Sequence, residues 1–338
     1  MHHAKSFSII VFVSVLGYAA IGFYFLPLAT FHGELTRMSL LPESLFGWTK
    51  PQPQLDIKWM QQATLQEADV LVIGDSFSDS RVWQSVLTQN NLKVRTESWN
   101  SMQGICGDFA NWAKAQGFKG RYVIAEIVER NLIGTLQRST DCAQTQYHPH
   151  ASVDAPRYPP AVSFDTKQGN YAGKLSTGIK TRLNVLEYEH RSRPDDFKLW
   201  ELPNNVKVAR VKDGCDYFSH ASCKDSLFLA EDESAEVNTI AFELIEAHAT
   251  RLHDFTTIWV VVPNKFTTYL YPHKTFWNEA NLRLRMPNLL LVNQLALHNK
   301  TVDLYPANNT HYSTTGYLLM GQEIFKAISA TTPSRPAH

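Results

Sequence analysis

The chain has 338 residues, of which 44% are apolar, and its 32 basic residues balance its 32 acidic residues. This composition is typical of a globular protein with a sizeable core, and it excludes a mainly disordered chain and a basic nucleic-acid-binding surface. We therefore expect no nucleic acid among its partners.

Residues 1–28 contain an apolar run that predicts a membrane anchor. No Asp, Glu, Lys or Arg occurs between Lys5 and Glu34, and residues 9–26 are almost continuously apolar. A helix rises about 1.5 Å per residue, so about 20 apolar residues cross a hydrocarbon core of about 30 Å. Because Lys5 precedes the run, the amino end is expected to stay cytoplasmic and the body to be exported. A signal peptide cleaved near Ala20 is the alternative, and it exports the same body.

The rest of the chain divides into a linker and one body. Residues 29–55 predict a linker with one short helix, because prolines recur there among mixed polar residues. The body is expected to span residues 56–332. Within it, residues 138–228 are rich in prolines and polar residues, which indicates an insertion or lid rather than a second core.

Four short apolar runs predict strands that are buried on both faces of a parallel sheet. They are residues 69–73, 121–127, 257–262 and 288–292. Stretches with apolar residues at helical spacing accompany them, at residues 107–116, 231–252 and 314–328. This alternation predicts an α/β fold with three layers, α/β/α, in which ligands bind beyond the carboxyl ends of the strands.

Four cysteines, Cys106, Cys142, Cys215 and Cys223, allow three complete pairings. An exported body meets an oxidising compartment, so disulfides are expected, and the short spacing favours the pair Cys215–Cys223. Cys106 and Cys142 then form either a second pair or two unpaired thiols. No Cys/His group has the spacing of zinc ligands, so we expect no metal and no cofactor.

The first predicted strand runs into Gly74-Asp75-Ser76, a candidate nucleophile turn. Gly74 permits a tight turn, and the beginning of a following helix offers free N–H groups near the serine oxygen. Such a turn combines a weak hydroxyl nucleophile with stabilisation of an oxyanion. The alternative is an ordinary helix cap, a position that Asp and Ser favour.

The candidate general base is His311, which lies just before the last predicted helix. A histidine titrates near neutrality, so it can accept the serine proton and return it to a leaving group. The chain has 13 histidines, and most are expected at surface or structural positions. The place of His311 beside the active edge of the sheet, together with Ser76, favours it over the others.

These residues carry a family resemblance. Gly74-Asp75-Ser76 and His311 resemble the first and fifth blocks of the SGNH (GDSL) hydrolases. Further pieces resemble the alginate O-acetyltransferase branch of that superfamily, namely residues 74–78, 125–130, 215–219, 227–232 and 262–265. The resemblance covers scattered pieces between residues 65 and 330. It implies an SGNH-like domain with a flavodoxin-like parallel sheet behind the membrane helix.

The acid that orients the histidine in these families is replaced here. Asn309 stands where the alginate branch has aspartate, and Asn308 stands at the aspartate position of ordinary SGNH enzymes. An amide can orient an imidazole but stabilises the imidazolium less than a carboxylate does. The order of the motifs, with His311 after Ser76, is closer to ordinary SGNH hydrolases.

The resemblance also assigns candidates for binding the oxyanion or the substrate. Gly104 corresponds to the oxyanion glycine of the second block, and a turn glycine is the alternative. Arg130 takes the place of the asparagine of the third block, and Asn131 follows it. Arg130 is a candidate for an oxyanion or a carboxylate, or for a structural pair with Glu126 or Glu129.

The resemblance implies O-acyl transfer, above all O-acetyl transfer, to hydroxyl groups of an extracellular or cell-envelope polysaccharide through an acyl-serine. The body would then be periplasmic, on an anchor in the inner membrane. Its partners would be the polysaccharide acceptor, which Lys265 and Tyr269 are candidates to contact, and an acyl donor, with a membrane-bound O-acyltransferase as candidate supplier. The alternatives are an exported carbohydrate esterase and a polysaccharide-binding relative without catalysis.

Overall fold

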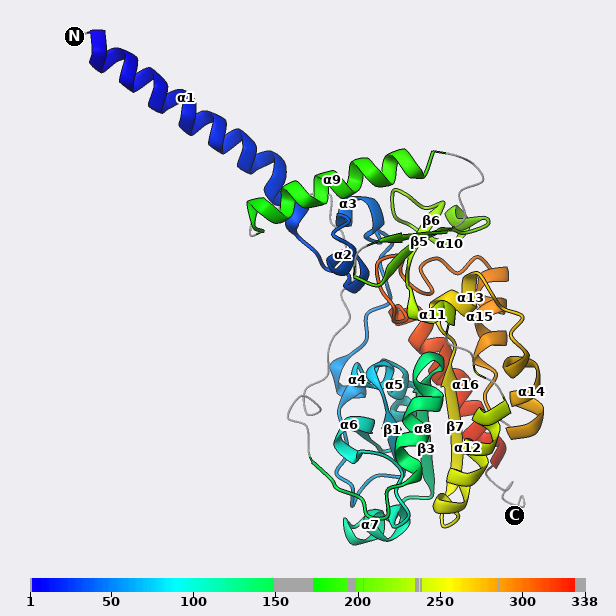
Figure 1. Cartoon of the computed structure of the whole chain (residues 1–338). Coiled ribbons are helices and arrows are strands. Elements are labelled where there is room, and N and C mark those ends of the chain that lie inside the picture. The colour runs from blue at the N-terminus through cyan, green and yellow to red at the C-terminus, as the bar shows by residue number, and fades with distance from the viewer. Residues whose placement is uncertain are drawn as a thin grey trace. The chain divides into compact units, whose positions relative to one another are not determined.

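The computed structural model describes residues 2–148, 173–193, 199–202, 204–234, 237, 239–284 and 286–331. The chain forms two compact units, each assembled from segments that are distant in sequence (Figure 1). Unit 1 consists of Met1–Pro51, Val162–Ala230 and Pro306–Thr310, and unit 2 consists of Gln52–Ala161, Glu231–Tyr305 and His311–His338.

Unit 2 is built on a four-stranded parallel sheet. Its strands, in spatial order, are β2 (Val94–Ser98), β1 (Val70–Gly74), β3 (Tyr122–Val128) and β7 (Thr256–Val262). Val70 pairs with Val94 on one side and with Tyr122 on the other. Every residue of β1 and β3 is buried, as expected for parallel strands that are covered on both faces.

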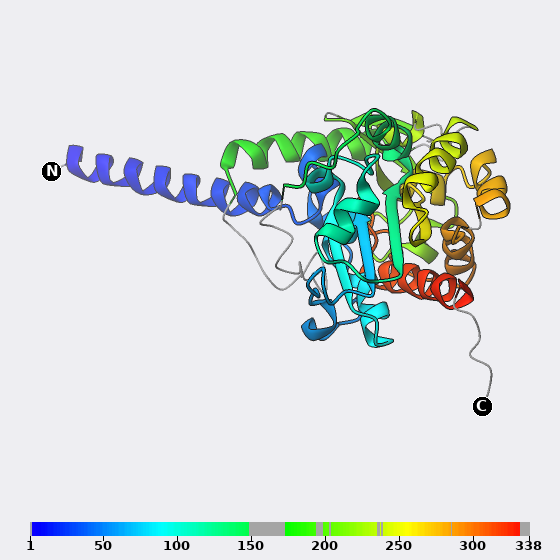
Figure 2. The same ribbon diagram turned by 90° about the horizontal axis from the view of Figure 1, so that it is seen from below.

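Helices cover both faces of this sheet. The helical elements of unit 2 are η2 (Ile57–Met60), α4 (Ser76–Asp79), α5 (Val82–Gln89), α6 (Trp99–Met102), α7 (Phe109–Ala115), η3 (Glu129–Asn131), α8 (Leu132–Thr140), α11 (Glu231–Ser234), α12 (Thr239–Ala249), η5 (Thr250–Leu252), α13 (Lys265–Tyr269), α14 (Thr275–Leu284), α15 (Leu289–His298) and α16 (Thr314–Thr331). Helices α7, α8 and α12 share one apolar core with Leu71, Val123 and Trp259 of the sheet. On the opposite face α16 packs on α5 and β7 (Figures 1 and 2). The α/β fold with a parallel sheet is therefore confirmed.

Three of the four predicted strands are confirmed as β1, β3 and β7, and the fourth is wrong. Residues 289–298 form helix α15, and the Asn288 side chain caps it by accepting a hydrogen bond from the Leu291 amide at 3.0 Å. The buried residues of α15 recur at helical spacing, and leucine is a good helix former, whereas the confirmed strands are rich in valine and isoleucine.

Strand β2 was not predicted from the sequence. It lies at the edge of the sheet, and its residues Val94-Arg-Thr-Glu-Ser98 contain no apolar run. Arg95 is half-buried and pairs with Glu97 at 2.7 Å. The buried polar side chains of this strand have hydrogen-bond partners, since Thr96 Oγ1 accepts from Gln84 Nε2 at 3.2 Å and Glu97 accepts from Arg95.

The predicted helices are present, with shifted ends. The prediction for residues 107–116 corresponds to α7, and that for residues 314–328 corresponds to α16. Within residues 231–252 the described elements are α11, α12 and η5, while residues 235, 236 and 238 lie outside the described residues.

Unit 1 combines helices with a three-stranded antiparallel sheet. Its elements are α1 (His2–Phe25), η1 (Leu26–Ala29), α2 (Glu34–Ser39), α3 (Glu43–Phe46), α9 (Leu175–Arg191), β4 (Leu199–Leu202), β5 (Val206–Arg210), α10 (Gly214–Tyr217) and β6 (Asp225–Leu229). Residues 29–55 were expected to be a linker, but Leu35 of α2, Phe46 of α3 and Leu41 between the two helices are completely buried. The prolines mark the ends of short helices, since Pro42 is the N-cap of α3.

The region expected to be an insertion supplies α9 and the sheet of unit 1. In β5 and β6, the side chains of Val206, Val208, Leu227 and Phe228 are fully buried, which differs from a lid without a core. Residues 149–172, 194–198 and 203 of this region lie outside the described residues, as does residue 332 of the predicted body.

The amino-terminal helix is long and apolar enough to cross a membrane. The apolar span extends over His3–Ala29, and none of it is buried against the rest of the protein. The prediction of an amino-terminal apolar helix is thus confirmed by length and composition. The choice of membrane and the orientation stay predictions.

The four cysteines form two disulfides. Cys106 and Cys142 are joined in unit 2 with their Cα atoms 4.9 Å apart, and Cys215 and Cys223 are joined in unit 1 at 4.7 Å. The preferred pair is confirmed, and the alternative of two unpaired thiols is wrong. Because disulfides persist in oxidising compartments, both bonds fit an exported protein.

Removing the two disulfides should cost unequal stability. Cross-linking restricts the unfolded chain more for a longer loop, and the bonds span 36 and eight residues of sequence. We expect the double replacement Cys106→Ala with Cys142→Ala to cost roughly 4 kcal/mol, and Cys215→Ala with Cys223→Ala roughly 2.5 kcal/mol. Urea unfolding of each variant measures this difference. A larger loss for the shorter loop would contradict the loop-length argument.

Candidate functional site

The candidate nucleophile lies on a turn between β1 and α4. Ser76 is the first residue of α4, and its side chain is exposed. Asp75 precedes it as the N-cap: its Oδ1 accepts a hydrogen bond from the Phe77 amide at 2.9 Å, and its Oδ2 accepts one from the Val128 amide at 2.7 Å. The carboxylate thereby joins the end of β1 to the end of β3 and fixes the backbone at Ser76.

Ser76 and His311 are brought together. The Nε2 atom of His311 lies 2.8 Å from the Oγ atom of Ser76, which is hydrogen-bond distance. The histidine ring packs on the ring of Phe77 with centroids 4.8 Å apart, and Phe77 is fully buried. With a neutral imidazole, the serine hydroxyl can donate to Nε2, which is the starting arrangement for transfer of its proton.

A buried aromatic cluster supports this pair. Tyr305, Tyr312 and Tyr317 surround Phe77, with ring centroids 5.6 to 6.4 Å from it. Burial raises the pKa of all three phenols, so they stay neutral. The Tyr312 hydroxyl donates to Asn293 Oδ1 at 2.9 Å, which fixes the ring that follows His311 in sequence.

A buried glutamate that was not predicted as part of the site holds the turn from below. Glu126 lies in the middle of β3 and is inaccessible to solvent. Its Oε2 accepts hydrogen bonds from the Asp75 amide at 3.1 Å and the Ser78 hydroxyl at 2.7 Å, while its Oε1 is buried without a hydrogen-bond partner. The signal in the sequence was a carboxylate within an otherwise apolar strand.

Gly74 is required by this packing. A Cβ atom at residue 74 would overlap the side chain of Ser78 and approach the Glu126 carboxylate. The glycine of Gly74-Asp75-Ser76 therefore makes room for the Ser78–Glu126 hydrogen bond under the turn.

The stability of the protein should depend on the protonation of Glu126. Burial, and then the nearby Asp75 carboxylate, raise the pKa of Glu126 well above its usual value. A raised folded-state pKa gives stability that is fully present below the unfolded pKa and is lost as pH rises through the folded pKa. Relative to Glu126→Gln, the wild-type protein should lose up to about 1.4 kcal/mol per pH unit between those two pKa values. Urea unfolding of both proteins over a pH series tests this, and parallel stability curves would contradict it.

A small cavity opens at Ser76. It has a volume of about 270 Å³ and is lined by Gly74, Asp75, Ser76, Asp79, Ser98, Trp99, Asn100, Asn131, Thr135 and Arg138. Its walls come from the residues that follow the carboxyl ends of β1, β2 and β3, which is where ligands bind in parallel sheets. Of the predicted substrate-binding residues, Asn131 lines this cavity, with an exposed side chain.

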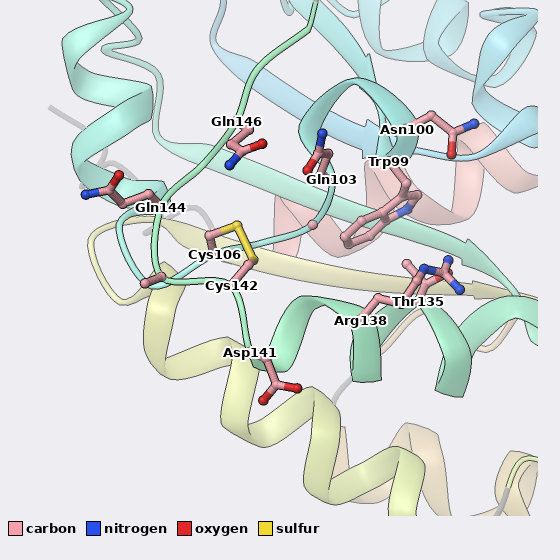
Figure 3. Close-up of a pocket in the computed structure, with 12 residues that line it drawn as sticks. Trp99, Asn100, Gln103, Cys106, Thr135, Arg138, Asp141, Cys142, Gln144 and Gln146 are labelled. Atoms are coloured by element: carbon pink, nitrogen blue, oxygen red, sulfur yellow. A yellow bond between two sulfur atoms is a disulfide. The ribbon is translucent and has the colours of Figure 1, made fainter.

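A larger cavity of about 720 Å³ adjoins the first, and the two share Trp99, Asn100, Thr135 and Arg138. Figure 3 shows the larger cavity, with the disulfide Cys106–Cys142 and the amide side chains of Gln103, Gln144 and Gln146 at its edge. This size is within the usual range for small-ligand pockets. Amide side chains both donate and accept hydrogen bonds, so they suit a ligand rich in hydroxyl groups.

Gly104 lines the larger cavity rather than the one at Ser76. Its φ angle is +141°, and a Cβ atom there would overlap the side chain of Ser139. The positive φ angle and the lack of space for a Cβ atom are sufficient reasons for a glycine at residue 104. They support the alternative that Gly104 is a structural turn glycine.

Arg130 forms a structural ion pair, but with partners other than those expected. Its Nη1 lies 3.3 Å from Asp232 Oδ1, and its Nε lies 3.7 Å from Glu231 Oε1. The expected pairing with Glu126 or Glu129 is wrong. Burial raises the pKa of Asp232 to about 6, against the opposing effect of the Arg130 charge.

Lys265 is buried, with 1% of its surface exposed, so the expectation that it contacts the acceptor at the surface is wrong. Burial lowers the pKa of Lys265 well below its usual value, although Asp232 and Asp303 act in the opposite direction. Tyr269 lies half-buried in the same helix, and its hydroxyl is within 3.4 Å of the Tyr305 carbonyl oxygen.

Asn308 and Asn309 belong to the segment Pro306–Thr310 of unit 1. Asn308 is fully buried, and its side-chain Nδ2 donates to Glu43 Oε2 at 2.7 Å. Its backbone carbonyl oxygen accepts a hydrogen bond from the backbone amide of Leu35 at 2.9 Å. Asn309 is half-buried, and its amide donates to the Pro306 carbonyl oxygen. Asn308 therefore has a structural role within unit 1.

Among the described residues no group of three or more His, Cys, Asp or Glu side chains is arranged to hold a metal ion. The described site residues that can take part in chemistry are a serine, a histidine and hydrogen-bonding side chains around a cavity.

No family model matches the chain, and no curated protein or solved structure matches it either.

Proposed function

We propose that this protein is an SGNH-type O-acyltransferase that forms an acyl-serine at Ser76 and passes the acyl group to a sugar hydroxyl. The observation that carries the proposal is the 2.8 Å hydrogen bond between Ser76 Oγ and His311 Nε2 at the mouth of a cavity. An exposed serine that is paired with a histidine at the carboxyl edge of a parallel sheet suits nucleophilic catalysis.

In the first half of the reaction, His311 Nε2 accepts the proton of Ser76 as Oγ attacks the carbonyl carbon of the acyl donor. The carbonyl oxygen becomes an oxyanion in a tetrahedral intermediate. When the intermediate collapses, the bond to the leaving group breaks and the imidazolium returns its proton to that group. The acyl group stays on Ser76 as an ester.

In the second half, a hydroxyl group of the acceptor takes the place of the leaving group. His311 accepts the hydroxyl proton, the acceptor oxygen attacks the acyl carbon, and Ser76 Oγ leaves and recovers the proton. The products are the acylated acceptor and the original enzyme. The hydrogen bonds of Asp75 keep Ser76 in place through both halves.

Donors for the oxyanion are available around the small cavity. The side chains of Asn100 and Asn131 line it with Ser76, and each carries an amide N–H₂ group. Arg138 is shared by both cavities, and its guanidinium donates a hydrogen bond to Thr135 Oγ1 at 3.1 Å. We assign oxyanion binding to this group of side chains ahead of Gly104.

The larger cavity favours a sugar acceptor over water. Its amide-rich edge suits hydroxyl groups, and it joins the cavity at Ser76 through Trp99 and Arg138. We therefore propose an extracellular or cell-envelope polysaccharide as acceptor, with an acyl donor supplied by a membrane-bound O-acyltransferase partner. The esterase alternative uses the same residues, and the exposure of Ser76 admits water to it.

The proposed location is the inner membrane, with the catalytic body in the periplasm. The apolar span His3–Ala29 and the two disulfides support a membrane-anchored, exported protein. Lys5 on the amino side of the span supports the orientation.

Brief incubation of the protein with an activated acetyl ester should add one acetyl mass to the peptide that contains Ser76. The folded Ser76→Ala variant should lose both the label and the burst of ester cleavage, because no acyl-enzyme can form. Mass spectrometry of the peptides and stopped-flow kinetics measure the two effects. Products formed with and without candidate polysaccharides separate transfer from hydrolysis.

Ser80→Ala is the matched control, because Ser80 is the C-cap of the same short helix and is half-buried. It should keep the label and the burst. If Ser76→Ala still acetylates a sugar at the wild-type rate, the proposed mechanism is overturned.

His311→Ala should lower turnover by about 10²- to 10⁴-fold, the usual contribution of a general base. Asn309→Ala should lower it much less, because an asparagine can at most orient the histidine and cannot replace it as the base. Steady-state kinetics of the two variants with the activated ester test this. Equal losses would assign Asn309 more than orientation, and full activity without His311 would mean that another residue is the base.

A further inference from the structure

Helix α9 of unit 1 has two apolar faces, and one of them is exposed. Gly178, Thr181, Val185 and Tyr188 form the buried face. On the other side Ile179, Leu183 and Leu186, spaced four and three residues apart, are 41%, 61% and 47% exposed. Residues at this spacing form one stripe along a helix. Three large exposed aliphatic side chains in one stripe indicate an interaction surface.

The exposed stripe begins beside the end of the apolar amino-terminal span. Gly178 of α9 packs directly on the backbone of Phe25, the last residue of α1, and a Cβ atom at residue 173 would overlap Ala29. Ala29 is also the last residue of the apolar span. Figures 1 and 2 show α9 passing the end of α1.

The arrangement within unit 1 directs the stripe toward the membrane side. In Figure 1, α2, α3 and the strands β5 and β6 lie below α9, while α1 leaves on the other side. Tyr188 of the buried face packs on the ring of Phe46 in α3 and donates a hydrogen bond to Asp225 of β6 at 2.9 Å, so the exposed stripe lies on the side of α9 away from these elements. A surface at the end of a membrane-spanning helix lies at the level of the lipid headgroups.

The charges around α9 also suit a lipid surface. Residues 174–193 contain five Lys and Arg residues and two Glu residues. Lys180 and Arg182 are adjacent to the stripe, and neither forms an ion pair in the described part of the chain. Long basic side chains can reach phosphate groups while their stems lie along apolar surface, as in helices that lie in a membrane interface.

We propose that α9 lies in the interface of the same membrane that α1 spans, with Ile179, Leu183 and Leu186 among the acyl chains and Lys180 and Arg182 at the headgroup phosphates. The proposal rests on α1 as a transmembrane helix and is independent of the chemistry at Ser76. The protein then has two membrane contacts, and the second one fixes the orientation of unit 1 on the bilayer.

Fluorescence of the full-length protein in vesicles tests this. The four native cysteines are in disulfides, so a single cysteine introduced at Leu183, Lys50 or Val13 can be labelled without reductant with an environment-sensitive fluorophore. Lys50 is an exposed residue of unit 1 outside α9, and its backbone amide donates to the Ser219 hydroxyl, while Val13 lies in the middle of α1. The vesicles contain phosphatidylcholine and phosphatidylglycerol, with or without a lipid that carries a quencher near its headgroup.

With Leu183→Cys we expect blue-shifted emission, strong quenching by the quencher lipid and protection from aqueous iodide. With Lys50→Cys we expect the opposite in all three measurements. Blue-shifted emission at residue 183 without lipid quenching would mean that the stripe contacts protein, such as a second copy of the chain, and would overturn the proposal. Equal iodide quenching at residues 183 and 50, with residue 13 protected, would also overturn it.

If residue 13 is itself accessible to iodide, α1 does not span the bilayer and the proposal fails at its premise. The pair Ile179→Glu and Leu183→Glu provides a second measurement on intact protein. In a wild-type-like fold, it should abolish the blue shift of a label at Leu186→Cys while the label at residue 13 stays protected. Acyl transfer at Ser76 is measured on the same samples, so failure of either proposal is distinguished from failure of the other.

Discussion

The carboxylate of Asp75 is the constraint on which the rest of the candidate site depends. One of its oxygens holds the first turn of α4, and the other holds the end of β3, with both donors being backbone amides. Hydrogen bonds to a charged acceptor are stronger than neutral ones, so this link between two strands is firm. The position of Ser76 follows from this link, because Ser76 lies in sequence between Asp75 and Phe77, whose backbone amide donates to the Asp75 carboxylate.

Glu126 of β3, the Asp75 amide and the Ser78 hydroxyl form a buried polar network next to this link, within an otherwise apolar sheet. The Oε1 atom of Glu126 is buried without a hydrogen-bond partner, in surroundings where burial penalises a charge. Its Oε2 atom nevertheless accepts hydrogen bonds from the Asp75 amide and the Ser78 hydroxyl. A buried polar group of this kind is costly unless it is satisfied, and it persists where the surrounding structure needs it. The ring of Phe77, the second residue of α4, packs on the ring of His311, so the positions of Ser76 and His311 both depend on the same short helix.

The sequence predicted the parts of the site whose local pattern is strong. Strand β1 was recognisable because the four apolar residues 70–73 precede a Gly-Asp-Ser turn, and His311 was recognisable from its place before an amphipathic helix. The run of leucines after Asn288 was wrongly predicted to be a strand, because a short apolar run is compatible with a buried helix as well as with a strand. Cavity residues such as Arg138 carry no signal in the sequence. Arg138 lines the cavity at Ser76 because α8 packs on the sheet through Leu132 and Leu136, which is a tertiary property.

The path of the chain has a consequence for how the protein matures. Strand β3 pairs with β7 through Tyr122 and Thr256, so the sheet of unit 2 stays incomplete until the chain has made a long excursion through unit 1. Contacts between such distant residues slow folding, because the loop must close before the pairing is gained. The chain then returns to unit 1 once more, at Pro306–Thr310, before it reaches His311. During synthesis Ser76 is therefore present long before His311, and a nascent chain that ends before residue 311 carries the proposed nucleophile without the proposed base.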